Sequence, residues 1–298
     1  MSEGQRRLSV GLPVFNGERF LAAAIQSVLD GSFTDFELII SDNGSTDATE
    51  AISRSFAEGD DRIRYVRNAT NIGPVGNFNQ VFRASSGEYF KWLAYDDLCG
   101  PDLLARCIDV LDGDPSIVLC GGRYVEIDEN GLPIGDQPYR IDLSSTKPHV
   151  RLGQLMCTSR GHPMLFGVIR ASTLRRTRLL AKYHGSDRAL LAELTLHGRL
   201  WEIPEVLWSS RDHPARSPYV RTKAAGWDPR RGRSLTPHLA SSVHLARVLA
   251  TAPVSRAERL RCSIELVTCL ARRSRELAPA LGRELLDAVQ SAVRRQTR

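Results

Sequence analysis

The chain has 298 residues, of which 42% are hydrophobic and 25% are charged, as expected for a globular protein with one large domain, alone or with an appendage. Its net charge is +6, and the whole excess lies in residues 236–298, which hold 11 arginines and 5 acidic residues against 29 basic and 29 acidic residues in 1–235. This distribution argues against nucleic-acid binding by the main part of the chain, where a basic groove would shift the balance.

The six cysteines form no CxxC pair and no Cys/His spacing typical of a metal site. We therefore expect reduced thiols in a cytoplasmic protein, with Cys262 and Cys269 on one buried helix face. Residues 1–7 are polar, and no apolar run approaches the ~18 residues that a membrane span requires. We expect no transmembrane segment.

The first predicted strand, residues 7–12, is followed by the elbow Pro13–Glu18 and by a helix. The helix is indicated by apolar residues at helical spacing, namely Phe20, Leu21, Ala24, Ile25 and Val28. The elbow contains neither GxGxxG nor GxxxxGK[ST], the two common phosphate-binding loops of strand-first domains. Dehydrogenases and P-loop NTPases are therefore disfavoured.

A second predicted strand, residues 36–41, ends at Asp42. Ser45 or Thr46 is expected to cap the next helix, which runs to about residue 56, with Asp47 near its positive end. Asp42 has two interpretations: it accepts a hydrogen bond from a ligand such as a nucleobase N–H, or it satisfies the amides of its own turn.

The third and fourth predicted strands cover residues 63–66 and 89–95, with a helix from Pro74 between them and another over 101–111. Strands that alternate with helices predict a parallel sheet with right-handed crossovers. The residues that follow its strands should then share one rim of the sheet, where ligands bind in such folds. They are Pro13, Asp42, Asn71 (with Asn77 and Asn79 nearby), Asp96 and Asp97.

Asp96 and Asp97 are adjacent carboxylates at the exit of the fourth strand. Like charges about 4 Å apart repel by roughly 4 kcal/mol at an effective dielectric near 20, so the pair needs a cation, strong donors or open water. A divalent ion with a phosphate ligand meets that need. Alternatively, one aspartate caps the helix that begins at Pro101.

After residue 115 we expect a mixed fold. Residues 117–120 and 123–127 predict antiparallel strands before a turn at 129–131, and residues 161–170 a loop that enters a strand. A basic helical piece over 174–180 and one or two short strands in 200–208 are also predicted. Gly185-Ser-Asp187 precedes an apolar helix that Gly198 ends, so Ser186 or Asp187 can be its N-cap.

Residues 211–233 are rich in Arg, Pro, Gly and Ser and form either a lid over a phosphate site or a solvated linker. The predicted boundary between domains lies at 235/236. In the basic helical segment 236–298, apolar residues spaced by four mark a final helix: Leu277, Leu281, Leu285, Val289 and Val293. Such a segment can dock on an anionic membrane, on the main domain or on a second subunit as a homodimer.

Four motifs in chain order carry a resemblance to a known family. They are Leu8-Ser-Val-Gly-Leu-Pro-Val-Phe-Asn16, Ile39-Ile-Ser-Asp-Asn-Gly-Ser-Thr-Asp47, Asn71-Ile-Gly73 and Tyr95-Asp-Asp97. The chain resembles a family 2 glycosyltransferase of the GT-A fold over about residues 7–215. The resemblance implies an α/β fold with a mixed, mainly parallel sheet flanked by helices, here followed by a C-terminal helical appendage.

The resemblance also implies transfer of a sugar, with inversion, from a nucleotide diphosphate sugar (UDP-type favoured) to a hydroxyl acceptor such as a glycan, lipid or natural product. Asp187 matches the catalytic base, and Arg211 a diphosphate ligand. Asp97 and His213 match ligands of Mn²⁺ or Mg²⁺. The implied nucleotide-binding residues are Pro13, Val14, Phe15, Asn16, Glu18, Asp42, Asn71, Asn77, Tyr95 and Asp96. Asn43 and Ser186 depart from the pattern, which has an acidic residue at each of these positions.

Two other functions compete with this one. A nucleotide-binding or membrane-associated interaction protein on the same fold needs no base, so Asp96, Asp97 and Asp187 together favour the enzyme. A nucleotidyltransferase would carry a Gly-rich basic loop directly after the first strand, and the elbow Pro13–Glu18 lacks one. It would release pyrophosphate, whereas a glycosyltransferase releases a nucleotide diphosphate.

Overall fold

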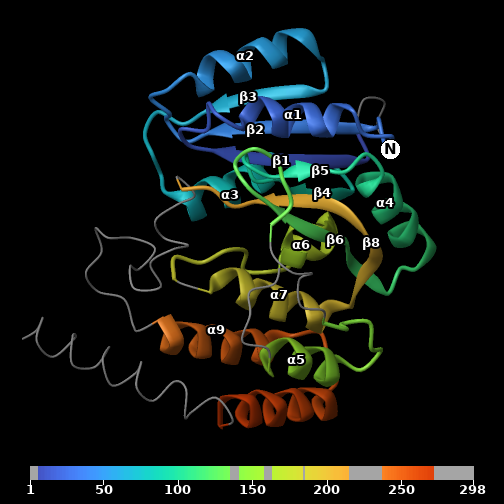
Figure 1. The fold of residues 1–298 in the computed structure, drawn as a ribbon. Coiled ribbons are helices and arrows are strands. Elements are labelled where there is room, and N and C mark those ends of the chain that lie inside the picture. Colours follow the sequence, from blue (N-terminus) through green and yellow to red (C-terminus); the bar gives the residue numbers. More distant parts are fainter. Residues whose placement is uncertain (1–5, 135–140, 158–162, 184, 215–236, 272–298) are drawn as a thin grey trace, which may run out of the picture.

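The computed structural model describes residues 6–134, 141–157, 163–183, 185–214 and 237–271 (Figure 1). Strands and helices alternate over the first third of the chain, as predicted. They are β1 (Leu8–Val14), α1 (Leu21–Leu29), β2 (Phe36–Asp42), α2 (Thr49–Gly59), β3 (Ile63–Arg67), α3 (Pro74–Arg83) and β4 (Tyr89–Trp92). β1 pairs in parallel with both β2 and β4, and β2 pairs in parallel with β3. The carboxyl ends of all four strands therefore face the same side.

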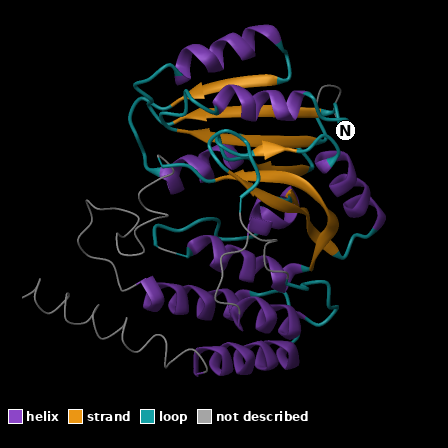
Figure 2. Cartoon of the chain, viewed as in Figure 1, coloured by secondary structure: helices purple, strands orange, loops and turns teal. Residues whose placement is uncertain are grey.

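The second part of the chain completes a mixed sheet (Figure 2). Its elements are β5 (Leu98–Cys99), α4 (Leu103–Gly113), β6 (Ile117–Ile127), α5 (Pro148–Cys157), the 3-10 helix η1 (Pro163–Phe166), β7 (Val168–Arg170), α6 (Ala171–Leu174), α7 (Ser186–His197), β8 (Arg199–Arg211) and α9 (Pro237–Thr251). The eight strands lie in the order β3-β2-β1-β4-β7-β6-β8-β5. β7 is antiparallel to β4 and β6, while β6 and β8 are parallel. The predicted fold class, a mainly parallel sheet flanked by helices, is confirmed.

Two hydrophobic cores lie on opposite faces of the sheet because side chains alternate along each strand. On β4, Phe90 and Trp92 enter the core beneath α3 and α7, whereas Tyr89 enters the core beneath α1 and α4. On β2, Ile39 shares the face of Phe90, and its neighbours point to the other face. Both faces are covered, which explains why these strands read as nearly continuous apolar runs.

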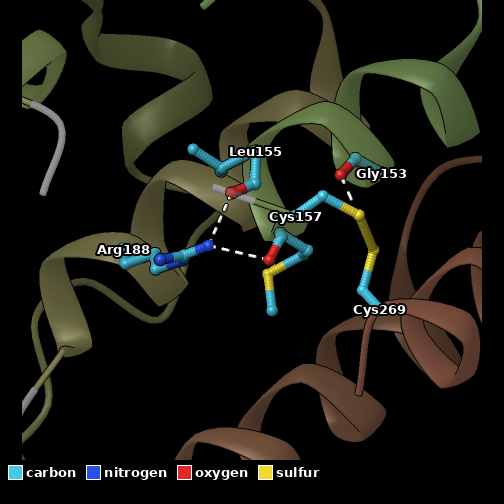
Figure 3. Close-up of a disulfide and its surroundings, with 6 residues drawn as sticks. Gly153, Leu155, Cys157, Arg188 and Cys269 are labelled. Atoms are coloured by element: carbon cyan, nitrogen blue, oxygen red, sulfur yellow. Dashed lines mark hydrogen bonds between the residues drawn. A yellow bond between two sulfur atoms is a disulfide. The ribbon is translucent and has the colours of Figure 1, made fainter. Parts of the chain in front are cut away.

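The C-terminal helices pack into the first of these cores. Leu245 and Val248 of α9 join α7 there, and so do Cys262 and Cys269 from the helical residues 256–271. Cys269 forms a disulfide with Cys157 at the end of α5, with 5.5 Å between the two Cα atoms (Figure 3). The expectation of reduced thiols throughout is therefore wrong for this pair, which joins residues 112 positions apart. Cys262 and Cys269 are both buried, as predicted.

Several predicted elements differ from the structure. Residues 117–127 form one strand, β6, where two antiparallel strands were predicted. Its long partner, β8, is parallel to it and is also a single strand. The predicted helix over 174–180 is instead the end of α6 followed by turns, and Leu179 has a positive φ of 57° that ends any helix. The predicted boundary at 235/236, most of the 211–233 loop and the final helix lie outside the described residues.

No helix of the described residues is long and apolar enough to cross a membrane.

Gly167 offers a direct test of the packing between β6 and the start of β7. A Cβ atom on Gly167 would overlap the main-chain carbonyl of Cys120, which cannot move without disturbing the strand. We expect Gly167→Ala to lower the free energy of unfolding by about 1–3 kcal/mol. The control is Gly59→Ala at the end of α2, where nothing lies within 4 Å, and where a change of at most about 1 kcal/mol in the stabilising direction is expected. Urea unfolding measures both; equal stabilities would contradict the packing.

Candidate functional site

The loops after β1 and β2 interlock at the carboxyl edge of the sheet. Asn16 Oδ1 accepts a hydrogen bond from the Thr46 main-chain N–H at 2.9 Å, and the Asn16 N–H donates to Ser45 Oγ at 2.9 Å. Asn16 holds a positive φ of 51°, a conformation that asparagine tolerates better than most residues. Two of the loops expected to surround a nucleotide are thus fixed to each other before any ligand binds.

Glu18 and Asp47 strengthen this junction by exchanging hydrogen bonds across the two loops. Glu18 Oε2 accepts from the Ala48 N–H at 2.9 Å, and Asp47 Oδ2 accepts from the Glu18 N–H at 3.0 Å. Partial burial raises the pKa of Asp47. Hydrogen bonds from Thr49 and from the Glu18 main chain together lower this pKa by more than burial raises it, so the pKa lies below its ordinary value. The predicted cap by Ser45 or Thr46 is wrong: α2 begins after Ala48, and Asp47 accepts from the Thr49 N–H.

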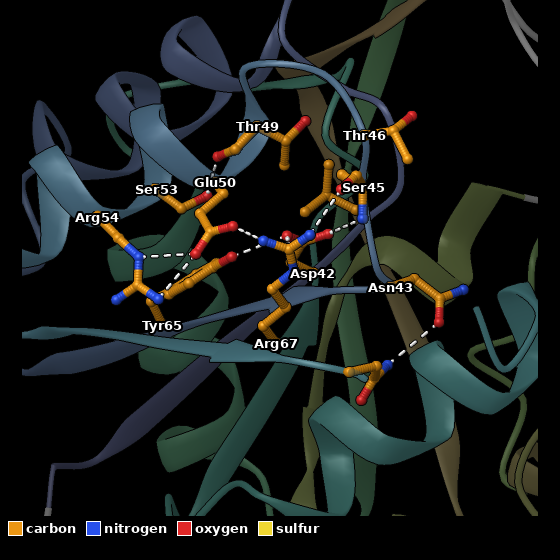
Figure 4. Close-up of polar contacts among 12 residues, drawn as sticks. Asp42, Asn43, Ser45, Thr46, Thr49, Glu50, Ser53, Arg54, Tyr65 and Arg67 are labelled. Carbon is orange, nitrogen blue, oxygen red and sulfur yellow. Dashed lines mark hydrogen bonds and ion pairs between the residues drawn. The ribbon is translucent and has the colours of Figure 1, made fainter. Parts of the chain in front are cut away.

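Asp42 is fully buried at the end of β2, and both of its carboxylate oxygens have protein partners (Figure 4). Oδ1 accepts from the Ser45 N–H at 2.8 Å, and Oδ2 accepts from the Tyr65 hydroxyl at 2.8 Å with Arg67 Nε 3.7 Å away. Burial, reinforced by the bond to Asp42, raises the pKa of Tyr65, so this hydroxyl stays protonated and donates. The structure favours the interpretation of Asp42 as a residue that holds its own turn.

Asparagines connect the next loop to the rim. Asn71 Oδ1 accepts from Asn43 Nδ2 at 2.9 Å, which ties the turn before α3 to the turn after β2. Asn77 is buried and forms two hydrogen bonds with Ser41. Asn77 Oδ1 accepts from the Ser41 hydroxyl at 2.6 Å, and Asn77 Nδ2 donates to the Ser41 carbonyl at 2.7 Å. Asn77 therefore binds α3 to β2, so its amide is engaged inside the protein.

The remaining predicted nucleotide residues differ in exposure. Pro13 and Val14 are both buried in β1, and Val14 belongs to the core beneath α1 and α4. Phe15 is 42% exposed, and its ring is one of the large apolar groups open to solvent. Tyr95 is half-buried, and an added Cβ on Gly17 would lie 2.7 Å from its ring, so the loop after β4 packs directly on the elbow after β1.

The adjacent carboxylates Asp96 and Asp97 lie at the same rim and are both buried, with exposed fractions of 6% and 2%. Asp97 Oδ1 accepts from the Arg211 N–H at 2.9 Å, and Asp96 Oδ2 lies 3.1 Å from His213 Nε2. His213 in turn packs against Phe20 in a tilted arrangement, with 4.6 Å between the ring centroids and 52° between the ring planes. The end of β8 therefore supplies the strong donors that the pair requires, and neither aspartate caps α4, whose N-cap Asp102 makes no capping hydrogen bond.

Arg211 is 5% exposed, and its guanidinium is held by main-chain oxygens. Nε donates to the Asp96 carbonyl at 3.0 Å, and Nη1 donates to the carbonyls of Asp128 and Glu129 at 3.0 and 3.3 Å. The group also lies over the Phe20 ring, 4.8 Å from its centroid. Arg211 therefore clamps the loops after β4 and β6 to the end of β8, and its role as a diphosphate ligand stays a prediction.

The donor set at the rim fits a divalent ion of the kind that the resemblance implies. Magnesium uses one or two protein carboxylates and completes its shell with water and phosphate oxygens. Asp97 supplies a carboxylate, and His213 Nδ1 is buried with no hydrogen-bond partner among the described residues. Those residues contain no group of three or more His, Cys, Asp or Glu side chains able to hold a metal. Phosphate oxygens would therefore have to contribute ligands.

Asp187 lies in the first turn of α7 and is exposed. The N-cap of this helix is Gly185, with a positive φ of 82° and no capping side chain, so the predicted cap by Ser186 or Asp187 is wrong. Burial, together with the charges of Asp187 and Glu193, raises the pKa of the neighbouring Tyr183 hydroxyl. The Asp187 carboxylate is thus available at the positive end of a helix, backed by a protonated tyrosine.

The predictions did not include the polar chain behind Asp42. Arg67 forms an ion pair with Glu50 and donates to the Ser45 carbonyl at 2.8 Å, so β3 buttresses the turn after β2 (Figure 4). A sequence signal exists, because Tyr65 and Arg67 are two apart on a strand and so share one face. Their partners on β2 and α2 could not be read from that spacing.

Comparison with known proteins places the chain in a family. Residues 9–171, more than half of the chain, match the model of glycosyl transferase family 2, and the chain belongs to that family. An uncharacterized glycosyltransferase of Rickettsia typhi is 30% identical over 222 residues, which are 70% of this chain and 65% of that protein. The chain thus matches less than two thirds of that relative's length.

Solved structures agree on the fold. A structure of Staphylococcus aureus TarS residues 1–349 in complex with UDP superposes with a TM-score of 0.66 at 16% identity, covering 90% of this chain and 72% of that one. The mannosyltransferase PcManGT from Pyrobaculum calidifontis, in complex with GDP-Man and Mn²⁺, gives a TM-score of 0.54 at 16% identity, covering 96% and 81%. The arrangement of strands and helices is the GT-A fold.

Arg211→Lys separates the structural role of Arg211 from a diphosphate role. Lysine keeps the charge but loses the planar fork that reaches three carbonyls, so we expect about 1–3 kcal/mol less stability. The control is Arg19→Lys, whose side chain is 56% exposed and pairs with Glu129, and which should change stability by less than about 1 kcal/mol. Chemical unfolding measures both. Unchanged stability for Arg211→Lys, with weaker nucleotide binding, would favour the diphosphate role.

Proposed function

We propose that this protein transfers a sugar, with inversion, from a nucleotide diphosphate sugar to an acceptor hydroxyl. One observation carries the proposal: the parallel strands bring the elbow after β1, the turn after β2 and the Asp96–Asp97 pair to one edge of the sheet, in a chain of glycosyl transferase family 2. Ligands bind at such an edge in open α/β sheets. The interlocked loops around it supply a rigid cradle.

The donor's nucleoside would lie against the interlocked loops after β1 and β2. The exposed ring of Phe15 offers an apolar surface there, and the Asn16 side chain is already oriented by Thr46. Four of the predicted nucleotide-binding residues have buried side chains and would support the shape of these loops from inside the protein: Pro13, Val14, Asp42 and Asn77. Complexes of related folds with UDP and with GDP-Man make a nucleotide diphosphate sugar the natural ligand class.

A divalent ion, Mn²⁺ or Mg²⁺, would be held by Asp97 and by the diphosphate, with the lone pair of His213 Nδ1, which has no hydrogen-bond partner among the described residues, as a further ligand. Its chemistry would be that of a Lewis acid that stabilises the charge left on the diphosphate. Asp96 would orient His213 and lie beside the ribose. Arg211 would hold the Asp96–Asp97 loop in place while the donor binds.

Asp187 would act as the general base. An acceptor hydroxyl is a weak nucleophile, and an inverting displacement needs a base on the face opposite the leaving diphosphate. The Asp187 carboxylate is exposed and lies in the first turn of α7, at the positive end of the helix dipole. The apolar residues of the helix fix it against the core through Leu190, Leu191 and Leu194.

A thermal-shift panel tests the donor class. A ligand that binds only the folded state stabilises it by RT ln(1 + [L]/Kd), about 2.7 kcal/mol at a hundredfold excess over Kd. We expect one nucleotide and its diphosphate sugar, among UDP, GDP, ADP and their sugars, to raise the melting temperature in the presence of Mn²⁺. Absence of a shift with every member of the panel would contradict nucleotide-sugar binding.

Asp97→Asn should abolish the dependence of nucleotide binding on a divalent ion. Asparagine keeps an oxygen that accepts from the Arg211 N–H, so the loop should keep its conformation while the charge that attracts the metal is lost. Calorimetry with Mn²⁺ and with EDTA measures the effect, with Asp109→Asn on the exposed face of α4 as the matched control. Equal affinity of the wild-type protein in Mn²⁺ and in EDTA would contradict the metal role.

Asp187→Asn should slow transfer by about 10²- to 10⁴-fold once a donor and an acceptor are in hand. The side chain is exposed and makes no capping bond, so melting temperature and donor binding should stay close to those of the wild type. Turnover is followed as released nucleotide diphosphate. Near-normal turnover would move the search for a base to the histidines, of which His162 and His184 lie outside the described residues.

A further inference from the structure

The outward face of the last described helix carries large apolar side chains. Residues 256–271 are helical, and Leu260, Ile264 and Val267 on this segment are 64%, 56% and 65% exposed. Their spacing of four and three residues places them on one side of the helix. We call these three residues the apolar stripe. Few other large apolar side chains in the described part of the chain are as open to solvent.

The opposite face of this helix is already used. Cys262, Leu266 and Cys269 are buried in the core shared with α7, and the Cys157–Cys269 disulfide attaches the helix covalently to α5 (Figure 3). A second attachment is the pair between His149 Nδ1 and Glu258 Oε2, 2.8 Å apart. The helix cannot turn the apolar stripe inward without breaking these contacts. The stripe therefore faces away from the part of the chain that the structure describes.

The attachment to α5 should persist at neutral pH. Hydrogen bonds from His149 and Arg261 lower the pKa of Glu258 to about 2, so this carboxylate is ionised, and its contact with His149 on α5 holds the helix. His149 faces Glu258, and the other charged groups near the pair are Arg261 on the same helix and Arg151 on α5. The orientation of the stripe thus rests on a covalent bond and on a hydrogen bond between side chains, two contacts of different kinds.

Charge indicates what the stripe meets. Arg256 and Arg261 are exposed on the same helix, and residues 272–298, which follow it, hold 7 arginines and 3 acidic residues. A second copy of this chain, docked through the same face, would bring two positive segments together, and the segment 272–298 itself has the same sign as the helix. An anionic partner with an apolar interior matches both features, and a bilayer that contains acidic phospholipid is such a partner.

We propose that the apolar stripe docks on a membrane surface rich in anionic phospholipid, with the helix of residues 256–271 lying in the plane of the interface. Leu260, Ile264 and Val267 enter the boundary between headgroups and acyl chains, while the exposed Arg256 and Arg261 of this helix contact the headgroups. The surface lies on a different element from the donor site, so the inference does not depend on the proposed reaction.

Sedimentation of the full-length protein with vesicles tests the proposal. Vesicles of phosphatidylcholine alone are compared with vesicles that also contain phosphatidylglycerol, at low and at high salt. We expect binding to the phosphatidylglycerol vesicles, weakening as salt screens the headgroup charge. Leu260→Glu and Ile264→Glu should each weaken it by about tenfold or more, because each places a charge in the apolar boundary.

The control is Leu132→Glu, which adds the same charge at a leucine that is 63% exposed in a turn after β6. It should bind vesicles as the wild type does. All three variants change exposed side chains, so an unchanged melting temperature confirms that their folds are intact. Arg256→Gln combined with Arg261→Gln supplies an independent arm: it leaves the stripe intact and should reduce only the preference for phosphatidylglycerol.

Three results would overturn the proposal. The first is equal partitioning of the wild type to both kinds of vesicle. The second is a dimer, seen by light scattering, that Ile264→Glu dissociates, because the stripe would then be an interface between two copies. The third is a monomer that binds neither vesicle, because the stripe would then be covered by residues 272–298.

Discussion

The parallel pairing of β1 with β2 on one side and β4 on the other is the constraint on which the candidate site depends. The register sets Val14 opposite Asp42 and Gly11 opposite Trp92, so the three strands run out at neighbouring points of one edge. Each strand then delivers a loop to that edge. The contacts among Asn16, Ser45 and Thr46 follow from this arrangement, as does the packing of Tyr95 on Gly17.

The acidic groups at this edge are balanced mainly by backbone amides, by the Tyr65 hydroxyl and by the buried ring of His213. Asp42 and Asp97 accept from the N–H groups of Ser45 and Arg211, while Asp96 faces His213. A buried carboxylate without such donors would be costly, so the loops and their aspartates stabilise one another. A site built in this way is ordered before a ligand arrives, which lowers the entropy lost on binding.

The helices on the far face of the sheet have a different role. α5, α7, α9 and the helical residues 256–271 share one core, and the Cys157–Cys269 disulfide closes that layer. α7 belongs to this layer through its apolar side, and its first turn presents Asp187, the base of the proposed reaction. The proposed base is therefore held by the layer that also fixes the direction of the apolar stripe.

The sequence by itself determined the features that depend on near neighbours along the chain. Short apolar runs located the first four strands, and the polar turns after them located the rim, including Asp96 and Asp97. Only the tertiary structure decided which groups meet across long separations. Arg211 lies 114 residues from the Asp97 carboxylate that it serves, and Cys157 lies 112 residues from Cys269. The direction of β8 beside β6 was undetermined for the same reason. Local periodicity specifies which face of an element is buried, whereas the partner of a buried polar group depends on where the rest of the chain packs.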